Sequence, residues 1–301
     1  MSLVSCKGLS KSYGGKQALS QVSITLEAGS PIALVGPNGA GKTTLFSLLC
    51  GFITPSSGEV SLLGEKPGSA ALLGRVASLP QDAALDPNLD IITQLTLFAS
   101  LQGFSAKAAK AEGLRVLTLV DLVDSAQQKP KSLSHGMSKR VSIAQALIGS
   151  PELVLLDEPT AGLDPANAKK IRELVKKLSN TTTFIISSHN LDELEKLCDQ
   201  VLYLEQGQLS QSVSMKESLH EDYLTLTMQQ CDASALISAV MELADISSID
   251  ERQANQFLIK HNSEETYAIE MALLSLFKQH NWQYKAILKG RTLEEKLFSQ
   301  P

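Results

Sequence analysis

The chain has 301 residues, of which 43% are hydrophobic and 20% charged, which is the composition of an ordinary globular protein. Its formal net charge of −5 argues against a nucleic-acid partner, because nonspecific binding to DNA or RNA needs clustered lysine and arginine. No apolar run approaches the ~20 residues of a membrane-crossing helix, and the start lacks the pattern of a secretory signal, so we expect a cytoplasmic chain.

Strands alternate with helices along the first two thirds of the sequence. Residues 22–26 alternate apolar and polar side chains, which is typical of a half-buried strand, whereas residues 32–35 are all apolar and favour a buried central strand. Helical spacing follows from about 42 to 50 and from about 91 to 128, and the segments 153–156 and 183–187 are again short apolar strands. This order predicts an α/β fold with a parallel sheet.

The character of the sequence changes near residue 215. Strand patterns occur around Leu226, Ile249 and Leu258 and again over 282–288, and helical patterns cover 233–244 and about 265–278. The order β-α-β-β-α-β predicts a small α+β domain of ferredoxin-like topology. We therefore expect two domains, 1–214 with a helical subdomain at about 83–150, and 215–301.

A glycine-rich loop follows the second predicted strand. It fits the pattern G-x-x-x-x-G-K-[ST], and it reads Gly36-Pro37-Asn38-Gly39-Ala40-Gly41-Lys42-Thr43, with Thr44 next. Between a strand and a helix, such a loop directs backbone N–H groups at phosphates. We expect Lys42 to reach the β- and γ-phosphates of a nucleotide and the hydroxyl of Thr43 to ligate Mg²⁺. The alternative is a structural glycine turn.

Two acidic residues, Asp157 and Glu158, end the apolar strand at 153–156. At the carboxyl edge of a parallel sheet, Asp157 can hold Mg²⁺ through water, and Glu158 can polarise the water that attacks the γ-phosphate. By itself such a pair is usually a solvated strand end, but a phosphate-binding loop in the same chain favours the catalytic interpretation.

A second helix start combines a serine with a glycine, in the run Ser134-His135-Gly136-Met137. A Ser-x-Gly turn that opens a helix presents a hydroxyl and free N–H groups, and so forms a second phosphate-binding end. Taken alone, the same residues describe an ordinary helix N-cap.

The phosphate loop, the Ser-x-Gly turn and the acidic strand end, in this order along the chain, resemble the nucleotide-binding subunit of ABC transporters over about residues 1–210. The resemblance implies a P-loop NTPase with a mixed sheet core and a helical subdomain. It implies that Tyr13 stacks on adenine, that Gln81 joins the metal site to the helical subdomain, and that His189 contacts the γ-phosphate. Leu163-Asp164 matches the loop that crosses the dimer interface. Each of these residues, taken singly, also has a purely structural explanation.

The resemblance implies an ATPase that uses ATP and Mg²⁺. Catalysis would fall to Lys42, Gln81, Glu158 and His189, and metal binding to Thr43, Gln81 and Asp157. Two copies, most simply a homodimer, would pack head to tail, with each ATP between the phosphate loop of one copy and the turn at 134–136 of the other. Residues 134–137 would thus bind the partner's nucleotide.

The resemblance extends to exporter-type subunits, whose permease is a separate integral membrane chain. It rests on Met137 in place of the commoner glutamine, on residues 158–165, and on Leu293-Glu294-Glu295. Such a subunit lies on the inner face of the cell membrane and passes motion to the permease through residues 83–103. One position departs from the family, which mostly has glycine where this chain has His135. That side chain either crowds the partner's nucleotide or points away from it.

Two other functions fit a chain with these motifs. One is a soluble ABC ATPase that works on ribosomes or nucleic acid, but those proteins usually carry two such domains or long coiled coils. The other is a scaffold that binds ATP without hydrolysing it, and the intact Lys42, Asp157, Glu158 and His189 argue against that role. The transporter subunit is therefore the favoured interpretation.

Overall fold

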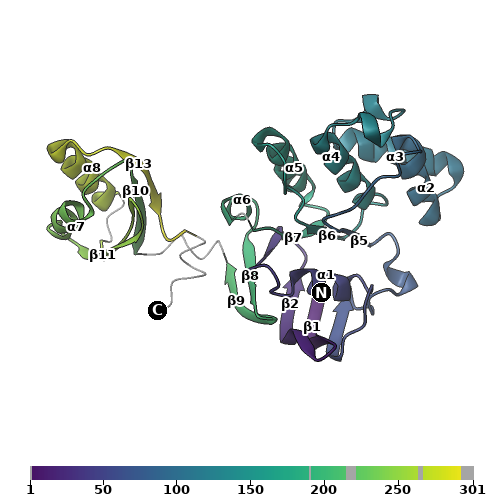
Figure 1. Ribbon diagram of the computed structural model, residues 1–301, viewed down its shortest axis with the longest axis horizontal. Coiled ribbons are helices and arrows are strands. Elements are labelled where there is room, and N and C mark those ends of the chain that lie inside the picture. Colours follow the sequence, from purple (N-terminus) through teal and green to yellow (C-terminus); the bar gives the residue numbers. More distant parts are fainter. Residues whose placement is uncertain (1, 190, 215–221, 264–266, 293–301) are drawn as a thin grey trace. The chain divides into compact units, whose positions relative to one another are not determined.

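The computed structural model describes residues 2–189, 191–214, 222–263 and 267–292, and the chain divides into two compact units (Figure 1). The units are Met1–Val213 and Ser214–Pro301. The exporter-type motif Leu293-Glu294-Glu295 lies outside the described residues. In the described part of the chain, no helix combines the length and the apolar character that a bilayer crossing requires.

A six-stranded sheet in the order β5-β6-β7-β3-β8-β9 forms the centre of the first unit. Its strands are β3 (Ile32–Val35), β5 (Val76–Leu79), β6 (Leu153–Asp157), β7 (Thr183–Ser187), β8 (Gln200–Glu205) and β9 (Gln208–Ser214). The pairs from β5 through β8 are parallel, and a two-residue turn makes the β8–β9 pair antiparallel. Because β3, β6 and β7 are buried on both faces, they consist of apolar runs, as the sequence predicted.

An antiparallel sheet in the order β2-β1-β4 packs onto this core. It comprises β1 (Ser2–Tyr13), β2 (Lys16–Glu27) and β4 (Ser57–Leu62). Two glycines with positive φ, Gly14 and Gly15, form the tight turn between β1 and β2. This turn fixes Tyr13 at the very end of β1.

Most helices of the first unit begin at a capped residue. Helix α1 (Lys42–Leu49) follows β3, while α2 (Ile91–Leu101), α3 (Ala106–Leu119) and α4 (His135–Ala146) gather into a helical subdomain (Figure 1). Helices α5 (Pro165–Leu178) and α6 (Leu191–Glu195) come later, and short 3-10 turns occupy Ala70–Leu72, Val123–Ser125 and Pro130–Ser132. The side chains of Asp90, Ser105, Ser134 and Asp164 accept hydrogen bonds from the first turns of α2 to α5.

The second unit is an antiparallel sheet with helices α7 and α8 packed into its core. Its elements are β10 (Tyr223–Met228), α7 (Ala233–Met241), β11 (Ile246–Gln253), β12 (Gln256–His261), α8 (Ala268–His280) and β13 (Tyr284–Lys289). The strand order β11-β12-β10-β13 places β10 between β12 and β13, so each β-α-β segment is split by another strand. Its core contains Leu226, Leu236, Phe257 and Leu273. The predicted fold class, an α/β nucleotide-binding domain with a small ferredoxin-like α+β domain, is confirmed.

Candidate active site

The glycine-rich loop connects the end of β3 to the start of α1. At its first residue, Gly36, a Cβ atom would lie 2.0 Å from the carbonyl oxygen of Leu204, so any larger residue would collide with backbone. The loop then turns into α1 at Lys42, and the free N–H groups of that helix start face the loop. The local structure is therefore that of an anion-binding helix N-terminus.

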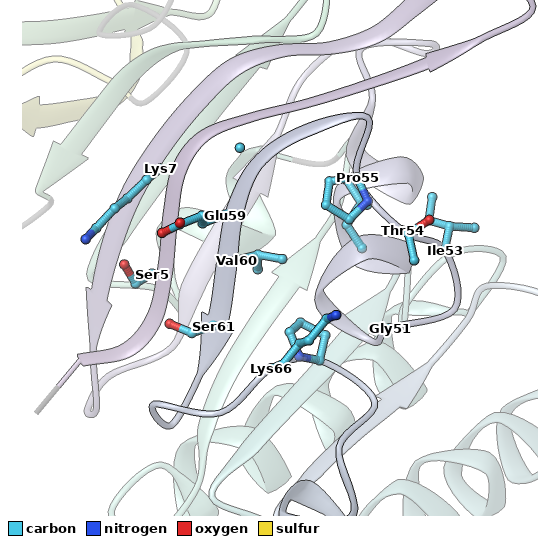
Figure 2. Close-up of a pocket in the computed structure, with 13 residues that line it drawn as sticks. Ser5, Lys7, Gly51, Ile53, Thr54, Pro55, Glu59, Val60, Ser61 and Lys66 are labelled. Atoms are coloured by element: carbon cyan, nitrogen blue, oxygen red, sulfur yellow. The ribbon is translucent and has the colours of Figure 1, made fainter.

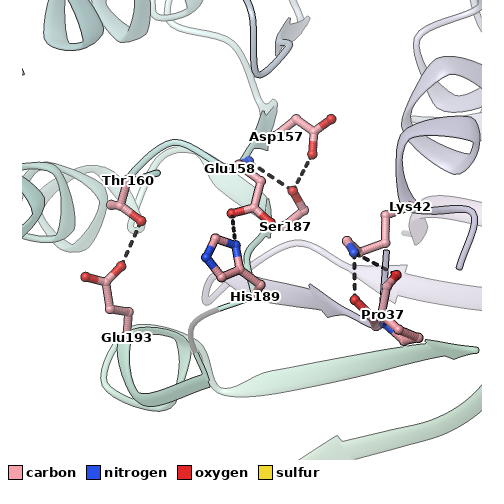
Figure 3. A network of polar contacts seen from close by, with 9 residues as sticks. Pro37, Lys42, Asp157, Glu158, Thr160, Ser187, His189 and Glu193 are labelled. Carbon is pink, nitrogen blue, oxygen red and sulfur yellow. Dashed lines mark hydrogen bonds and ion pairs between the residues drawn. The ribbon is translucent and has the colours of Figure 1, made fainter. Parts of the chain in front are cut away.

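Lys42 lies over the loop that precedes it (Figure 3). Its ammonium donates hydrogen bonds to the carbonyl oxygens of Gly36, at 2.6 Å, and Pro37, at 3.2 Å. An ammonium carries three hydrogens, so this arrangement fixes the charge at the loop and leaves one donor for an anionic oxygen.

A hollow of about 380 Å³ surrounds this loop and brings together segments that are far apart in the sequence. Lys16, Gln17 and Ala18 line it, and these residues were not predicted. The predicted residues that line it are Tyr13, Asn38, Gly39, Ala40, Gly41, Lys42, Thr43, Thr44, Gln81, Asp157 and Glu158. Tyr13 is half exposed, with the Lys11 ammonium 5.2 Å from the centre of its ring. Its position at the rim suits a ring that stacks on a base.

Several oxygen atoms that could ligate a metal lie close together at Asp157, where the carboxyl ends of β6 and β7 are neighbours. The hydroxyl of Thr43 donates to one carboxylate oxygen at 3.3 Å, and the hydroxyl of the fully buried Ser187 donates to the other (Figure 3). Oxygen atoms of hydroxyl, carboxylate and amide groups are the ligands that Mg²⁺ prefers, and Gln81, which lines the same hollow, carries an amide. The residues thus fit this metal. Ser187 was not predicted as a site residue, although a polar side chain at the end of an apolar strand was a usable signal.

Glu158 is held in a conformation that few residues other than glycine adopt. Its φ is 47°, and its N–H donates to both the carbonyl and the hydroxyl of Ser187, at 3.2 and 3.0 Å. Only 8% of the residue is exposed. The surrounding hydrogen bonds hold the strained backbone in place, so the carboxylate stays at the edge of the hollow.

The imidazole of His189 contacts this carboxylate, with Nδ1 2.9 Å from Oε2 of Glu158 (Figure 3). The histidine side chain as a whole is 72% exposed. The sequence predicted a contact between His189 and a phosphate, but it did not predict a contact with Glu158. A hydrogen-bonded imidazole fixes the orientation of a buried carboxylate.

A neighbouring network was also missed from the sequence. The hydroxyl of Thr160 donates to Glu193 at 2.7 Å, and Arg172 donates to the other oxygen of the same carboxylate at 2.9 Å. This network ties the segment after Glu158 to α5 and α6, and Figure 3 shows its contact between Thr160 and Glu193.

The turn at 134–137 lies at the start of α4, and none of its residues lines the hollow. Ser134 accepts a hydrogen bond from the N–H of Met137 at 3.2 Å, so it is the helix N-cap. A Cβ atom on Gly136 would lie 2.5 Å from the side chain of Asn167, so a larger residue here would require Asn167 to move. Within one chain, the structure therefore separates the two predicted phosphate-binding turns.

Asn167 links this turn to the loop before α5. Its amide donates to Asp164 at 2.7 Å, and Asp164 also accepts from the backbone N–H groups of Ala166 and Asn167. The backbone N–H and the side chain of Asn167 lower the pKa of Asp164, so the residue caps α5 as a carboxylate. The predicted dimer-crossing loop and the turn at 134–137 thus form one packed surface.

The His135 side chain is exposed and lies near Gly162, in the loop before α5 of its own chain. Its Nε2 lies 3.5 Å from the position that a Cβ on Gly162 would take. Because the ring is exposed and lies near its own chain, we expect His135→Gly to act as an ordinary surface substitution. ATP turnover should then change by less than about threefold. Steady-state hydrolysis at saturating ATP measures it. A loss of tenfold or more would show that the imidazole works on the partner's nucleotide.

A larger cavity, of about 580 Å³, lies between β1, β4 and the loop after α1 (Figure 2). It is lined by Lys7 and Lys66 and by the apolar residues Ile53, Pro55 and Val60. None of the predicted site residues lines it. The oxygen donors, the glycine-rich loop and the helix start all lie at the smaller hollow, and that hollow is the candidate active site.

Comparisons with known proteins agree with this assignment. The family model for the ABC transporter matches residues 19–161. The chain is 35% identical over 257 residues to the ABC transporter ATP-binding protein YcbN of Bacillus subtilis (strain 168), and the match covers 83% of each protein. This chain belongs to the ABC transporter ATP-binding proteins. As a member of that family it is an ATPase that binds ATP and couples its hydrolysis to transport across a membrane.

Two further similarities are to an export protein and to a solved ATP-binding cassette. It is 37% identical over 204 residues to the Nod factor export ATP-binding protein I of Burkholderia orbicola (strain AU 1054), with 67% of each chain covered. The dimeric structure of the ATP-binding cassette MJ0796, bound to ADP and Pi, matches with a TM-score of 0.64 and 26% identity. That match covers 70% of this chain and 98% of MJ0796.

Proposed function

We propose that this ABC ATPase works as a homodimer that drives an exporter, with the transport path in a separate integral membrane chain. It would act in the cytoplasm, on the inner face of the cell membrane, through that permease. The observation that carries the proposal is the separation of the two predicted phosphate-binding turns. The phosphate loop lines the hollow, whereas the turn at 134–137 lies outside it and would bind the nucleotide of a second chain. The similarity to a Nod factor export protein supports the exporter assignment.

In the proposed site, Lys42 binds the β- and γ-phosphates of ATP, and Tyr13 stacks on adenine. Thr43, Asp157 and Gln81 hold Mg²⁺, which when bound neutralises charge on the phosphate oxygens. Glu158 accepts a hydrogen bond from the attacking water and polarises it. His189 keeps the Glu158 carboxylate in place through its 2.9 Å contact.

The turn at 134–137 would complete the site of the partner. Its N–H groups open α4, and a helix N-terminus attracts anionic oxygens. A partner at this surface would also exclude water from the γ-phosphate, which strengthens each charge interaction inside. The dimeric state of MJ0796 with ADP and Pi supports the same arrangement here.

The permease would dock on the helical subdomain beyond Gln81. Helix α2 lies within the expected coupling segment, and its Leu97 and Leu101 are exposed apolar side chains. Exposed apolar side chains of this kind suit contact with another protein. An integral membrane chain would therefore have hydrophobic surface to bind on the segment that moves with Gln81.

Purification of the tagged full chain from detergent-solubilised membranes tests this function. We expect a polytopic membrane protein to co-purify at a stoichiometry near one permease assembly for each ATPase dimer. Purification with ribosomes or nucleic acid in place of a membrane protein would overturn the proposal and favour the soluble ATPase. A purified chain without ATP hydrolysis would favour the scaffold.

Removal of the second unit gives a separate prediction. A chain that ends at Val213 keeps the core, the hollow and the turn at 134–137, so we expect it to fold and to bind ATP with an affinity within about twofold of the full chain. Circular dichroism and titration with a fluorescent ATP analogue measure both properties. A soluble, folded product that fails to bind ATP would contradict the proposed division of labour between the units.

A further inference from the structure

Lys139 joins two parts of the site that no motif connects. It lies on α4, the helix that begins at the turn 134–137, and its ammonium donates to the backbone carbonyl of Gln81 at 3.0 Å. Gln81 lines the hollow of the same chain. One helix thus carries both the proposed half-site for the partner's nucleotide and a direct contact with the backbone of Gln81, a proposed metal ligand of its own chain.

The surroundings of Lys139 make this contact specific. The side chain is partly buried, and burial lowers the pKa of its ammonium, while the carboxylates of Asp82, Asp157 and Glu158 act in the opposite direction. The ammonium is therefore drawn toward the acidic side of the hollow as well as to the Gln81 carbonyl. Its hydrogen bond links the first residue after Pro80 to α4 across 58 positions of sequence.

The next residue anchors α4 in the opposite direction. Arg140 is buried and donates to the carbonyl of Val120, at the end of α3, at 2.7 Å. Helix α4 is thus fixed to the end of α3 by Arg140 and to the Gln81 segment by Lys139. A shift of Gln81 would be passed to α4 by the Lys139 bond, and α4 would carry its first turn with it.

We propose that Lys139 is a positioning residue that couples the two ATP sites of the dimer. Engagement of Gln81 at one site moves or steadies α4 through the Lys139 hydrogen bond, and this sets the turn at 134–137 for the nucleotide held by the partner. The inference rests on the proposed homodimer and on the proposed role of Gln81. Coupling between binding sites is reciprocal, so each site would raise the affinity of the other by the same factor.

Three variants of the full chain test the coupling. Lys139→Met keeps the length of the side chain but removes the donor and the charge, and Lys139→Arg keeps both. Lys131→Met makes the same change at an exposed lysine of the helical subdomain and is the matched control. Two quantities are measured for each: the Hill coefficient of ATP hydrolysis, and the affinity of the isolated site for a fluorescent ATP analogue at protein concentrations where the chain is monomeric.

We expect wild type, Lys139→Arg and Lys131→Met to show a Hill coefficient above one. For Lys139→Met we expect a coefficient near one and a half-saturating ATP concentration raised at least about fivefold, with the affinity of the monomer unchanged. Thermal melting checks that Lys139→Met is folded. If it is not, Lys139→Gln replaces it with the same expectation, because the glutamine side chain is too short to keep the hydrogen bond.

Unchanged cooperativity in Lys139→Met, or a Hill coefficient of one in wild type, would overturn the coupling and leave the proposed function intact. Loss of analogue binding by the monomeric variant would overturn it as well, because Lys139 would then belong to the nucleotide site itself. Failure of the proposed function has a different signature: wild-type chain that does not dimerise with ATP in gel filtration.

Discussion

Glu158→Gln is expected to lower ATP turnover at least ~10²-fold while Mg-ATP binding is retained. The amide has the size of the carboxylate, so the buried position and the contact with His189 can persist. It lacks the negative charge that polarises the attacking water, and it cannot take up the proton. Hydrolysis of ATP by the purified chain measures the loss.

The same variant should also accumulate as an ATP-bound dimer, because the step that releases the two chains is blocked. Gel filtration with and without Mg-ATP measures this. Glu173→Gln, the same change at an exposed residue of α5, is the control and should hydrolyse ATP at close to the normal rate. Near-normal turnover in Glu158→Gln would remove Glu158 from the role of general base.

Lys42→Ala is expected to fail one step earlier, at nucleotide binding. The change removes the positive charge that we expect to bind the phosphates. It also leaves the carbonyl oxygens of Gly36 and Pro37 without their hydrogen-bond donor. Loss of one partner from a buried charged pair typically costs 2–5 kcal/mol, so we expect ATP affinity to fall at least ~30-fold and hydrolysis to be abolished. Titration with a fluorescent ATP analogue measures the affinity.

Lys170→Ala, on the exposed side of α5, controls for the loss of a lysine elsewhere in the chain. The contrast with Glu158→Gln is the sharper test, since Glu158→Gln should bind ATP without hydrolysing it, whereas Lys42→Ala should lose ATP binding. Equal ATP affinity in Lys42→Ala and wild type would show that the phosphates lie elsewhere, for example at the larger cavity beside Lys7 and Lys66.

The parts of the site that sequence could predict are contiguous in the chain. The residues from Gly36 to Thr43 form one loop and the start of α1, and Asp157 and Glu158 lie at the end of β6, so spacing alone placed them on the right elements. The contacts of Glu158 with Ser187 and His189 depend on β6 lying beside β7. No local pattern encodes which strands are neighbours.

The same limit applies to longer-range contacts. The bond from Lys139 to Gln81 and the packing of Gly136 on Asn167 depend on where α4 sits relative to β5 and α5. In the second unit, alternation predicted the strands, because one face of each packs on α7 and α8. The insertion of β10 between β12 and β13 is a matter of pairing and register, which alternation leaves open.

The left-handed backbone conformation of Glu158 lowers the stability of the fold at the residue that we propose for catalysis. A residue with a side chain pays roughly 1–3 kcal/mol for such a conformation, whereas glycine or asparagine adopts it more readily. A glutamate at this position therefore costs stability, and its proposed role in hydrolysis is the function that this cost serves. Replacement of Glu158 by glycine or asparagine would relieve this cost, so we expect the protein to become more stable as hydrolysis is lost.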